Sequence, residues 1–463
     1  MSTKEMAMSD KLTPLDAAFL EVEDSDRHAN LSIGAVVVAE GPTPTDDDLI
    51  ERLSARIRSL PHAADRIHVI PLDLAAPTWV PDPNFDPARH FTRIGVPSPG
   101  RMCDLTDTVA WIMSERLDRD RPLWQCWLIE GLEDCRWAIL VKAHHSLIDG
   151  VTGARLFDVL FDKPLTSGPP TDNEAPKGPK SLYGKIIGFY CSTLRAPQRL
   201  ARRSVRIAEG TAQLAGDLLI PSANSSLNGP IGHQRRYGTA QVRMHDVRTI
   251  CSAFDVTVND VALACVTSSL RSLLLHRKED ISRHAVRTLV PVSVRASNTG
   301  TSFHNEVSLM LPFLPVEIED PVDRLQTIHR RLSRHKNGGE SGSGQTITAA
   351  AQYAPFMSSA WFIRLAMRVP QRSIVTVVTD VPGPTEKRRL LGRGIIGIYP
   401  YVPIAVRLRL GFAILSYHDQ LAFGITADYD SVSEVQLLSM SVEQEVASLL
   451  RSTRNPSSAG EFH

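Results

Sequence analysis

The chain has 463 residues, of which 43% are hydrophobic and 22% are charged, an ordinary composition for a globular protein with a sizeable core. Its 51 basic and 51 acidic side chains balance, which argues against a nucleic-acid partner, because such proteins normally carry a basic excess. The N-terminus has no apolar stretch resembling a signal peptide, and no run of about 18 apolar residues predicts a spanning helix. The six cysteines show no Cys-x-x-Cys spacing, so we expect reduced thiols and a cytoplasmic protein.

The N-terminal half shows one clear helix and one hairpin. Residues 45–60 fit a helix, because Thr45 can cap it and apolar residues recur every four positions. Two strands are predicted at 124–129 and 137–143, separated by a turn that contains Gly131 and Asp134.

The C-terminal half repeats the mixture after a segment rich in proline, glycine and lysine (163–180) and a helical stretch (182–219). Helices are predicted at 258–276 and 433–450, and strands at 287–294, 306–314, 374–379, 405–417 and 420–427. We therefore predict an α/β or α+β protein with two halves of similar size. The halves comprise residues 1–162 and 226–463, and residues 163–225 form the linker and a basic helix.

Two glycine-rich segments resemble nucleotide-binding motifs and are rejected. Gly392 to Gly397 fits Gly-x-Gly-x-x-Gly, but Pro400 and Pro403 forbid the helix that would face a pyrophosphate. We expect a loop that leads into a strand. Gly339 to Thr346 resembles a phosphate-binding loop, but Gln345 replaces the lysine that must reach the phosphates.

The segment His144-His145-Ser146-Leu147-Ile148-Asp149-Gly150 is the strongest candidate for a catalytic site. Adjacent residues in extended backbone point to opposite faces, so one imidazole can face a cleft while the other packs within the scaffold. The same geometry argues against a shared metal ion. Asp149 and Gly150 suit a sharp turn. A lone histidine at a strand end is usually structural, but this combination is more specific.

The His-His-x-x-x-Asp-Gly pattern resembles the signature of the CoA-dependent acyltransferase superfamily, which includes chloramphenicol acetyltransferase and peptide-synthetase condensation domains. Further segments are similar to the wax ester synthase/diacylglycerol acyltransferase family, especially actinobacterial triacylglycerol synthases. They are residues 15–20, 121–124, 227–231, 259–261, 291–295, 381–384 and 416–417. The resemblance implies two chloramphenicol-acetyltransferase-like halves with mixed sheets. Two departures from the family pattern are Thr379-Asp380, where Ser-Asn is usual, and His304 before Asn305.

The resemblance also implies acyl-CoA as donor and diacylglycerol or a long-chain alcohol as acceptor. His145 matches the family's general base, and an imidazole with a pKa near ~6.5 can remove a hydroxyl proton at neutral pH. His144 is then the supporting residue. Asp149 is expected to hold the turn through an ion pair with Arg295, and a direct relay to His145 is the less favoured alternative.

Gly150, Asn259, Asp260 and Arg295 are the residues assigned to substrate binding. Asn259 either donates a hydrogen bond to the thioester oxygen or the substrate, or caps the helix that begins beside it. Ser146 lacks the Gly-x-Ser-x-Gly elbow of a nucleophile, so direct transfer is expected. No metal site and no cofactor beyond acyl-CoA are then required.

Six positive and no acidic residues lie between Lys185 and Arg206, interleaved with apolar residues. This pattern suits a helix on an anionic membrane or a lipid droplet, whereas a partly buried helix with a solvated basic face is the alternative. We therefore expect a cytoplasmic protein peripherally associated with such a surface. Two other functions stay open: the same chemistry on a polyketide hydroxyl or an amine, and a non-catalytic lipid-binding paralogue. The intact motif argues against the paralogue.

Overall fold

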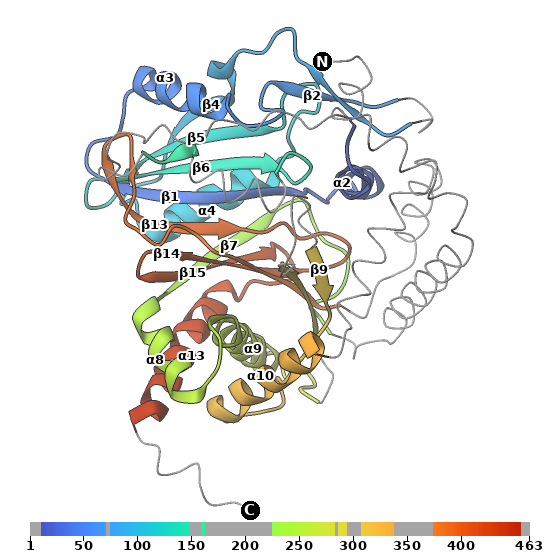
Figure 1. The fold of residues 1–463 in the computed structure, drawn as a ribbon, viewed down its shortest axis with the longest axis vertical. Helices are drawn as coiled ribbons and strands as arrows, with labels where there is room; N and C mark the ends of the chain where they lie inside the picture. Colours follow the sequence, from blue (N-terminus) through green and yellow to red (C-terminus); the bar gives the residue numbers. More distant parts are fainter. Residues whose placement is uncertain are drawn as a thin grey trace, which may run out of the picture.

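The computed structural model describes residues 11–70, 75–148, 159–162, 225–282, 286–293, 307–337 and 374–454. Two mixed sheets lie one above the other in Figure 1, with helices on the outer side of each sheet and one helix between the sheets. This is the predicted α/β architecture with two sheet-based halves.

The N-terminal sheet has six strands, and most of its neighbours are antiparallel. Only β4 and β5 run parallel. The order is β12 (Arg389–Leu390), β13 (Arg393–Tyr401), β1 (Ser32–Glu40), β6 (Arg136–His144), β5 (Trp124–Leu132) and β4 (Phe91–Gly95). A separate two-stranded sheet joins β2 (Asp65–His68) and β3 (Thr78–Pro81).

Two helices cover the N-terminal sheet. Helix α3 (Asp46–Ile57) begins at the cap Thr45, as predicted, and buries Leu49, Leu53 and Ile57 against one face. Helix α4 (Met102–Ser114) packs on the other face. Helix α2 (Pro14–Ser25) lies beyond the ends of β1 and β6 (Figure 1).

The C-terminal sheet follows the order β10 (Phe313–Leu314), β8 (Val286–Ser293), β11 (Thr376–Val381), β14 (Leu410–Tyr417), β15 (Gln420–Asp428) and β7 (Arg235–Arg243), with β9 (Val307–Met310) also paired to β8. Its helices are α8 (Met244–Phe254), α9 (Val258–His276), α10 (Pro321–Asn337) and α13 (Val435–Arg454). They share one large apolar core with the sheet. Helix α9 is long and apolar enough to span a membrane, but 67% of its apolar window is buried, as in the core helix of a globular half.

Two predicted strands differ from the structure. The strand predicted at 306–314 is divided into β9 and β10, because Pro312 cannot donate a ladder hydrogen bond. The strand predicted from residue 405 begins only at Leu410, because Val406 and Arg407 adopt left-handed backbone angles, with φ of 53° and 67°. By contrast, Gly392 does form a turn that leads into β13, as expected.

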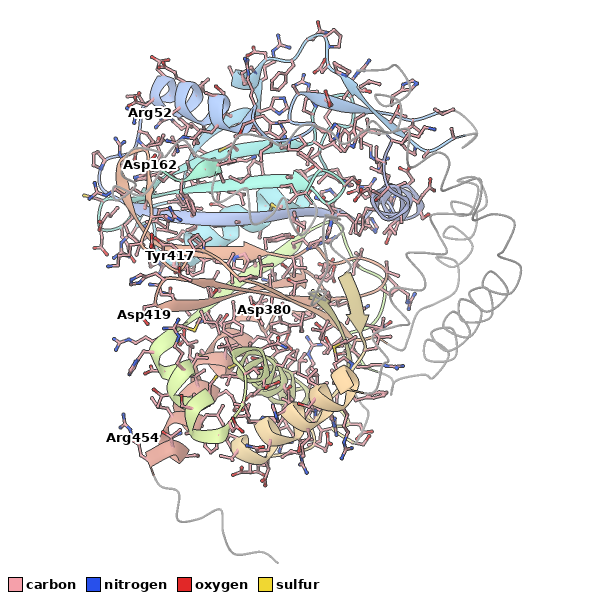
Figure 2. The ribbon with its side chains drawn as sticks, viewed as in Figure 1. Arg52, Asp162, Asp380, Tyr417, Asp419 and Arg454 are labelled. Atoms are coloured by element: carbon pink, nitrogen blue, oxygen red, sulfur yellow. The ribbon has the colours of Figure 1, made fainter. Side chains whose placement is uncertain are left out.

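The C-terminal half adds a hairpin to the N-terminal sheet, which the sequence did not reveal. Strand β13 belongs to the C-terminal half of the chain but pairs with β1, from Gly34 opposite Tyr401 to Ala39 opposite Ile395. Asp162 accepts a hydrogen bond from the Gly392 amide at 2.7 Å and pairs with Arg56 at 2.7 Å, which fixes the hairpin to the N-terminal half (Figure 2). The halves therefore share a sheet, although the linker assigned to residues 163–225 lies almost wholly outside the described residues.

The two sheets also approach closely. Tyr417 of β14 accepts a hydrogen bond from the Arg388 amide at 3.0 Å, and Figure 2 shows it between the sheets. Tyr237 of β7 donates to the Pro400 carbonyl at 2.8 Å. A methyl group added at Gly424 would lie 1.7 Å from the same carbonyl oxygen. A glycine is therefore required at this crossing.

Candidate active site

The histidine pair stands at the end of β6, and its two members have different surroundings. His144 is the last residue of the strand, opposite Ser32 of β1, and is 2% exposed. His145 follows the strand and is half-buried, and its amide donates to the Leu31 carbonyl at 3.1 Å. The expectation that one imidazole packs within the scaffold is confirmed for His144.

His144 is held from both ring nitrogens. Its Nδ1 accepts a hydrogen bond from the Ser146 amide at 3.1 Å, so in the neutral ring the proton resides on Nε2. That Nε2 lies 3.4 Å from the Oε1 atom of Glu23, slightly longer than an ordinary hydrogen bond, so the contact is mainly electrostatic. The arrangement fixes both the tautomer and the orientation of His144.

Glu23 of α2 is a buried carboxylate that the sequence interpretation missed. It is 3% exposed, and it accepts hydrogen bonds from the Leu31 amide at 2.7 Å and from Arg119 at 2.9 Å. Burial acts to raise the pKa of the Glu23 carboxyl, but His144, the Leu31 amide and Arg119 together lower it to about 2. Glu23 is therefore ionised at neutral pH, and its charge is matched by Arg119.

His145 and Ser146 are also contacted by α2. The ring of Phe19 stacks on the His145 imidazole, with centroids 4.1 Å apart and an interplanar angle of 28°. The Ser146 hydroxyl donates to the Asp16 carbonyl at 2.8 Å. A hydroxyl whose proton is committed to a backbone carbonyl is poorly placed for attack, which supports the rejection of Ser146 as a nucleophile.

One face of α2 thus supports the whole start of the motif. Asp16, Phe19 and Glu23 are spaced by three and four residues, so they share a helix face, and they contact Ser146, His145 and His144 in turn. Thr13 caps the helix and Pro14 occupies its first turn. The segment 15–20 was recognised as similar to the family's start, but its contact with the histidines was not predicted.

A buried cation lies two residues before His144 on the same face of β6. Lys142 is 1% exposed and donates to the backbone carbonyls of Ile112, at 2.7 Å, and Glu115, near the C-terminal end of α4. Burial lowers the pKa of Lys142 to about 8, although the charges of Glu115 and Glu23 oppose this effect. Together with Asn30, which donates to the Met113 carbonyl at 2.8 Å, it satisfies carbonyls that a helix end leaves unpaired.

The other predicted site residues have three outcomes. Asp149, Gly150 and Arg295 lie outside the described residues, so their expected roles stay predictions. Asn259 is half-buried at the second position of α9, and the cap of that helix is Thr257, so the capping alternative for Asn259 is wrong. Its contact with substrate stays a prediction.

Asp260 has a structural role in the described part of the chain, and its predicted contact with substrate stays a prediction. It is 2% exposed and accepts a hydrogen bond from the Thr257 amide at 2.8 Å, which completes a capping box. It also bonds His329 of α10 at 2.8 Å. A carboxylate this buried and this fully engaged joins two helices. Across the described part of the chain, no group of three or more His, Cys, Asp or Glu side chains could hold a metal ion.

Comparisons with known proteins cover almost the entire chain. The wax ester synthase/diacylglycerol acyltransferase catalytic domain matches residues 12–262, and the WS/DGAT C-terminal domain matches residues 303–449. The probable diacylglycerol O-acyltransferase tgs1 of Mycobacterium tuberculosis is 44% identical over 95% of both chains. The O-acyltransferase WSD of Acinetobacter baylyi is 28% identical over 94% of this chain and 96% of its own.

Solved structures agree with these matches. A wax ester synthase/diacylglycerol acyltransferase from Marinobacter aquaeolei VT8 has a TM-score of 0.68 at 25% identity, with 96% of this chain and 100% of that chain covered. The TRI3 trichothecene 15-O-acetyltransferase of Fusarium sporotrichioides shares the fold, with a TM-score of 0.62 over 95% of both chains. The resemblance inferred from the sequence is confirmed, and the chain belongs to the wax ester synthase/diacylglycerol acyltransferase family.

Proposed function

We propose that this acyltransferase moves a long-chain acyl group from acyl-CoA to the hydroxyl of diacylglycerol, with His145 as the general base. The family supplies the reaction class, and a relative that is 44% identical is described as a probable diacylglycerol O-acyltransferase. The assignment of His145 as the base rests on the different surroundings of the two histidines. His144 is buried against Glu23, whereas His145 is half-buried beyond the strand end.

The proposed transfer proceeds in one ternary complex. His145 removes the proton of the acceptor hydroxyl while its oxygen attacks the thioester carbonyl carbon. The carbon–sulfur bond then breaks, and the imidazolium returns the proton to the CoA sulfur. Triacylglycerol and free CoA leave, so atoms and charge balance without a cofactor. General-base assistance of this kind contributes about 10²–10⁴-fold.

The supporting residues keep the base in place. His144 joins the buried carboxylate of Glu23 to the Ser146 amide, so the backbone on both sides of His145 is fixed. Preorganisation of this kind matters because a misplacement of about 1 Å can cost on the order of 10²-fold in rate. Asp149 and Arg295 are proposed to hold the turn that follows.

Diacylglycerol is the proposed main acceptor, and a long-chain alcohol is a secondary one. The higher identity is to the mycobacterial diacylglycerol O-acyltransferase, and the Acinetobacter O-acyltransferase WSD is more distant. Apolar pockets separate similar ligands by only about 10–200-fold, so some wax ester synthesis is expected.

The test uses the purified full-length chain, labelled palmitoyl-CoA and three acceptors: dioleoylglycerol, hexadecanol and a small polar alcohol. His145→Ala should reduce triacylglycerol formation by at least about 10²-fold. His233→Ala is the matched control, because the His233 side chain is 52% exposed and lies outside the motif. Near-normal turnover by His145→Ala would show that His145 is not the general base. Exclusive wax ester formation, or transfer only to the polar alcohol, would contradict the acceptor, and no transfer at all would favour a lipid-binding paralogue.

We further propose that the chain acts at the inner face of the membrane or on lipid droplets, where its acceptor resides. The support is the basic and apolar pattern between Lys185 and Arg206, which lies outside the described residues. Co-sedimentation with vesicles that contain 30% phosphatidylglycerol would test this proposal. Binding should weaken in high salt and in a variant with Arg199, Arg202 and Arg203 changed to glutamine. Equal binding by that variant would contradict it.

A further inference from the structure

Phe19 connects the histidine motif to the C-terminal half of the chain. The Phe19 ring stacks on the His145 imidazole, with the two centroids 4.1 Å apart. Phe19 also belongs to a small apolar cluster with Val22, Ala29, Leu31, Ala405 and Val406, which we call the α2 cluster. Four of its members belong to or follow α2, and two belong to the connection between β13 and β14.

His145 contacts the α2 cluster in two ways. Its imidazole lies on Phe19, and its backbone amide donates to the Leu31 carbonyl at 3.1 Å. The ring and the backbone of His145 therefore both contact residues of the α2 cluster. A shift of that cluster would move the imidazole relative to anything bound beside it.

The C-terminal members of the cluster lie in a strained turn. Val406 and Arg407 have φ angles of 53° and 67°, a left-handed conformation that is particularly unfavourable for a β-branched residue such as valine. Such conformations persist only where the surrounding structure imposes them, and they gather at functional sites. Here the turn places Ala405 and Val406 in the α2 cluster, which also contains Phe19.

A second segment of the C-terminal half imposes this turn. The Gly229 amide donates to the Arg407 carbonyl at 2.9 Å, and the Arg409 amide donates to the Leu227 carbonyl at 3.1 Å. Asn228 bridges to Leu408. The segment 227–229 therefore clamps the turn, which gives a structural reason for one of the stretches that resembles the family.

We propose that Phe19 is a positioning residue for His145, and that the clamped turn Ala405–Arg407 holds Phe19 in place, so that packing between the two halves sets the orientation of the base. This inference rests on the proposed role of His145. It predicts that an aromatic ring at position 19 is needed for the rate of transfer and contributes little to substrate affinity.

Two substitutions at one position separate stacking from packing. Phe19→Tyr keeps the aromatic ring, whereas Phe19→Leu keeps an apolar side chain and removes the ring. We expect Phe19→Leu to lower kcat by about 10-fold or more with KM for acyl-CoA nearly unchanged, because an effect on orientation acts on the chemical step. Phe19→Tyr should retain kcat within about threefold, because the stacking partner remains. Unfolding temperatures of both variants are measured in parallel.

A substitution in the turn tests the link to the C-terminal half. Val406→Gly removes the side chain from the α2 cluster and also relieves the left-handed strain, so its stability should change little. We expect kcat to fall and KM to stay constant, as for Phe19→Leu. Val69→Gly is the control, because Val69 is 50% exposed and lies outside the cluster.

The possible results are distinct. Wild-type kcat in Phe19→Leu, or equal losses in the leucine and tyrosine variants, would overturn the role of Phe19. If both of those variants fail to fold, Val406→Gly becomes the test of the proposal. A wild-type kcat in Val406→Gly would overturn it. An active His145→Ala protein would instead remove the proposed function on which the inference rests.

Discussion

Replacing Glu23 by glutamine should remove the charge that holds His144 while leaving the shape of the side chain nearly intact. Glu23 is 3% exposed and faces His144 at 3.4 Å, Arg119 at 2.9 Å and the Leu31 amide at 2.7 Å. Glutamine resembles the protonated carboxyl in size and in lack of charge. The substitution therefore reports how strongly the fold prefers the ionised form.

The size of the effect follows from the pKa of this carboxyl. The contacts with His144, Leu31 and Arg119 outweigh burial and lower the pKa of Glu23 from 4.5 to about 2. Each pKa unit corresponds to about 1.4 kcal/mol, so Glu23→Gln should lower the free energy of unfolding at pH 7 by about 3 kcal/mol. Because the folded-state pKa is depressed, this stability is present above about pH 4.5 and is lost as the pH falls toward 2.

Urea denaturation of the wild type and the variant at several pH values between 2 and 7 measures this difference. The two stability curves should be separated at pH 7 and should converge as the pH approaches 2. Asp24→Asn is the matched control, because Asp24 pairs with the same Arg119 at 2.7 Å but is 52% exposed. Parallel curves for Glu23→Gln and the wild type, or an equal loss in Asp24→Asn, would refute the reasoning.

Three further predictions concern the scaffold and the motif. Burial lowers the pKa of Lys142 from 10.5 to about 8, so urea denaturation should show the free energy of unfolding of the wild type rising relative to that of Lys142→Met between pH 8 and 10.5. Gly424→Ala should lower the unfolding temperature by an amount equivalent to about 1–3 kcal/mol or more, because the added methyl would lie 1.7 Å from the Pro400 carbonyl oxygen, whereas Gly95→Ala, with nothing within 4 Å, should be tolerated. Ser146→Ala should retain acyl transfer within about tenfold, since only a hydrogen bond to the Asp16 carbonyl is lost; a decrease of 10³-fold or more would indicate a nucleophile.

Local patterns in the sequence predicted the elements whose partners are close along the chain. The helix at 45–60 and the hairpin of β5 and β6 were predicted with errors of a few residues. The predicted bounds of α9 are those observed, because apolar residues recur along its length and Thr257 and Asp260 close its first turn. In each case the determining contacts lie within about a dozen residues.

Pairing between distant segments could not be predicted in this way. Strand β13 pairs with β1 across more than 350 residues, and its sequence carries the same alternation of small and apolar residues as many other strands. The late start of β14 depends on the left-handed Val406, a conformation that valine does not favour on its own and that the clamp at Leu227–Gly229 imposes. Tertiary contacts override local preference in both cases.

The same distinction between local and long-range information applies to the candidate site. The histidine pair followed by Asp-Gly is rare enough to mark the chemistry from the sequence alone. A glutamate and a phenylalanine on a short helix contact the pair, and two small apolar residues nearly 400 positions later share a cluster with that phenylalanine. Such side chains occur throughout any chain in ordinary structural roles, so only their position in space identifies them. A reactive group is thus visible in the sequence, whereas the supports that orient it become visible when the two halves are seen packed together.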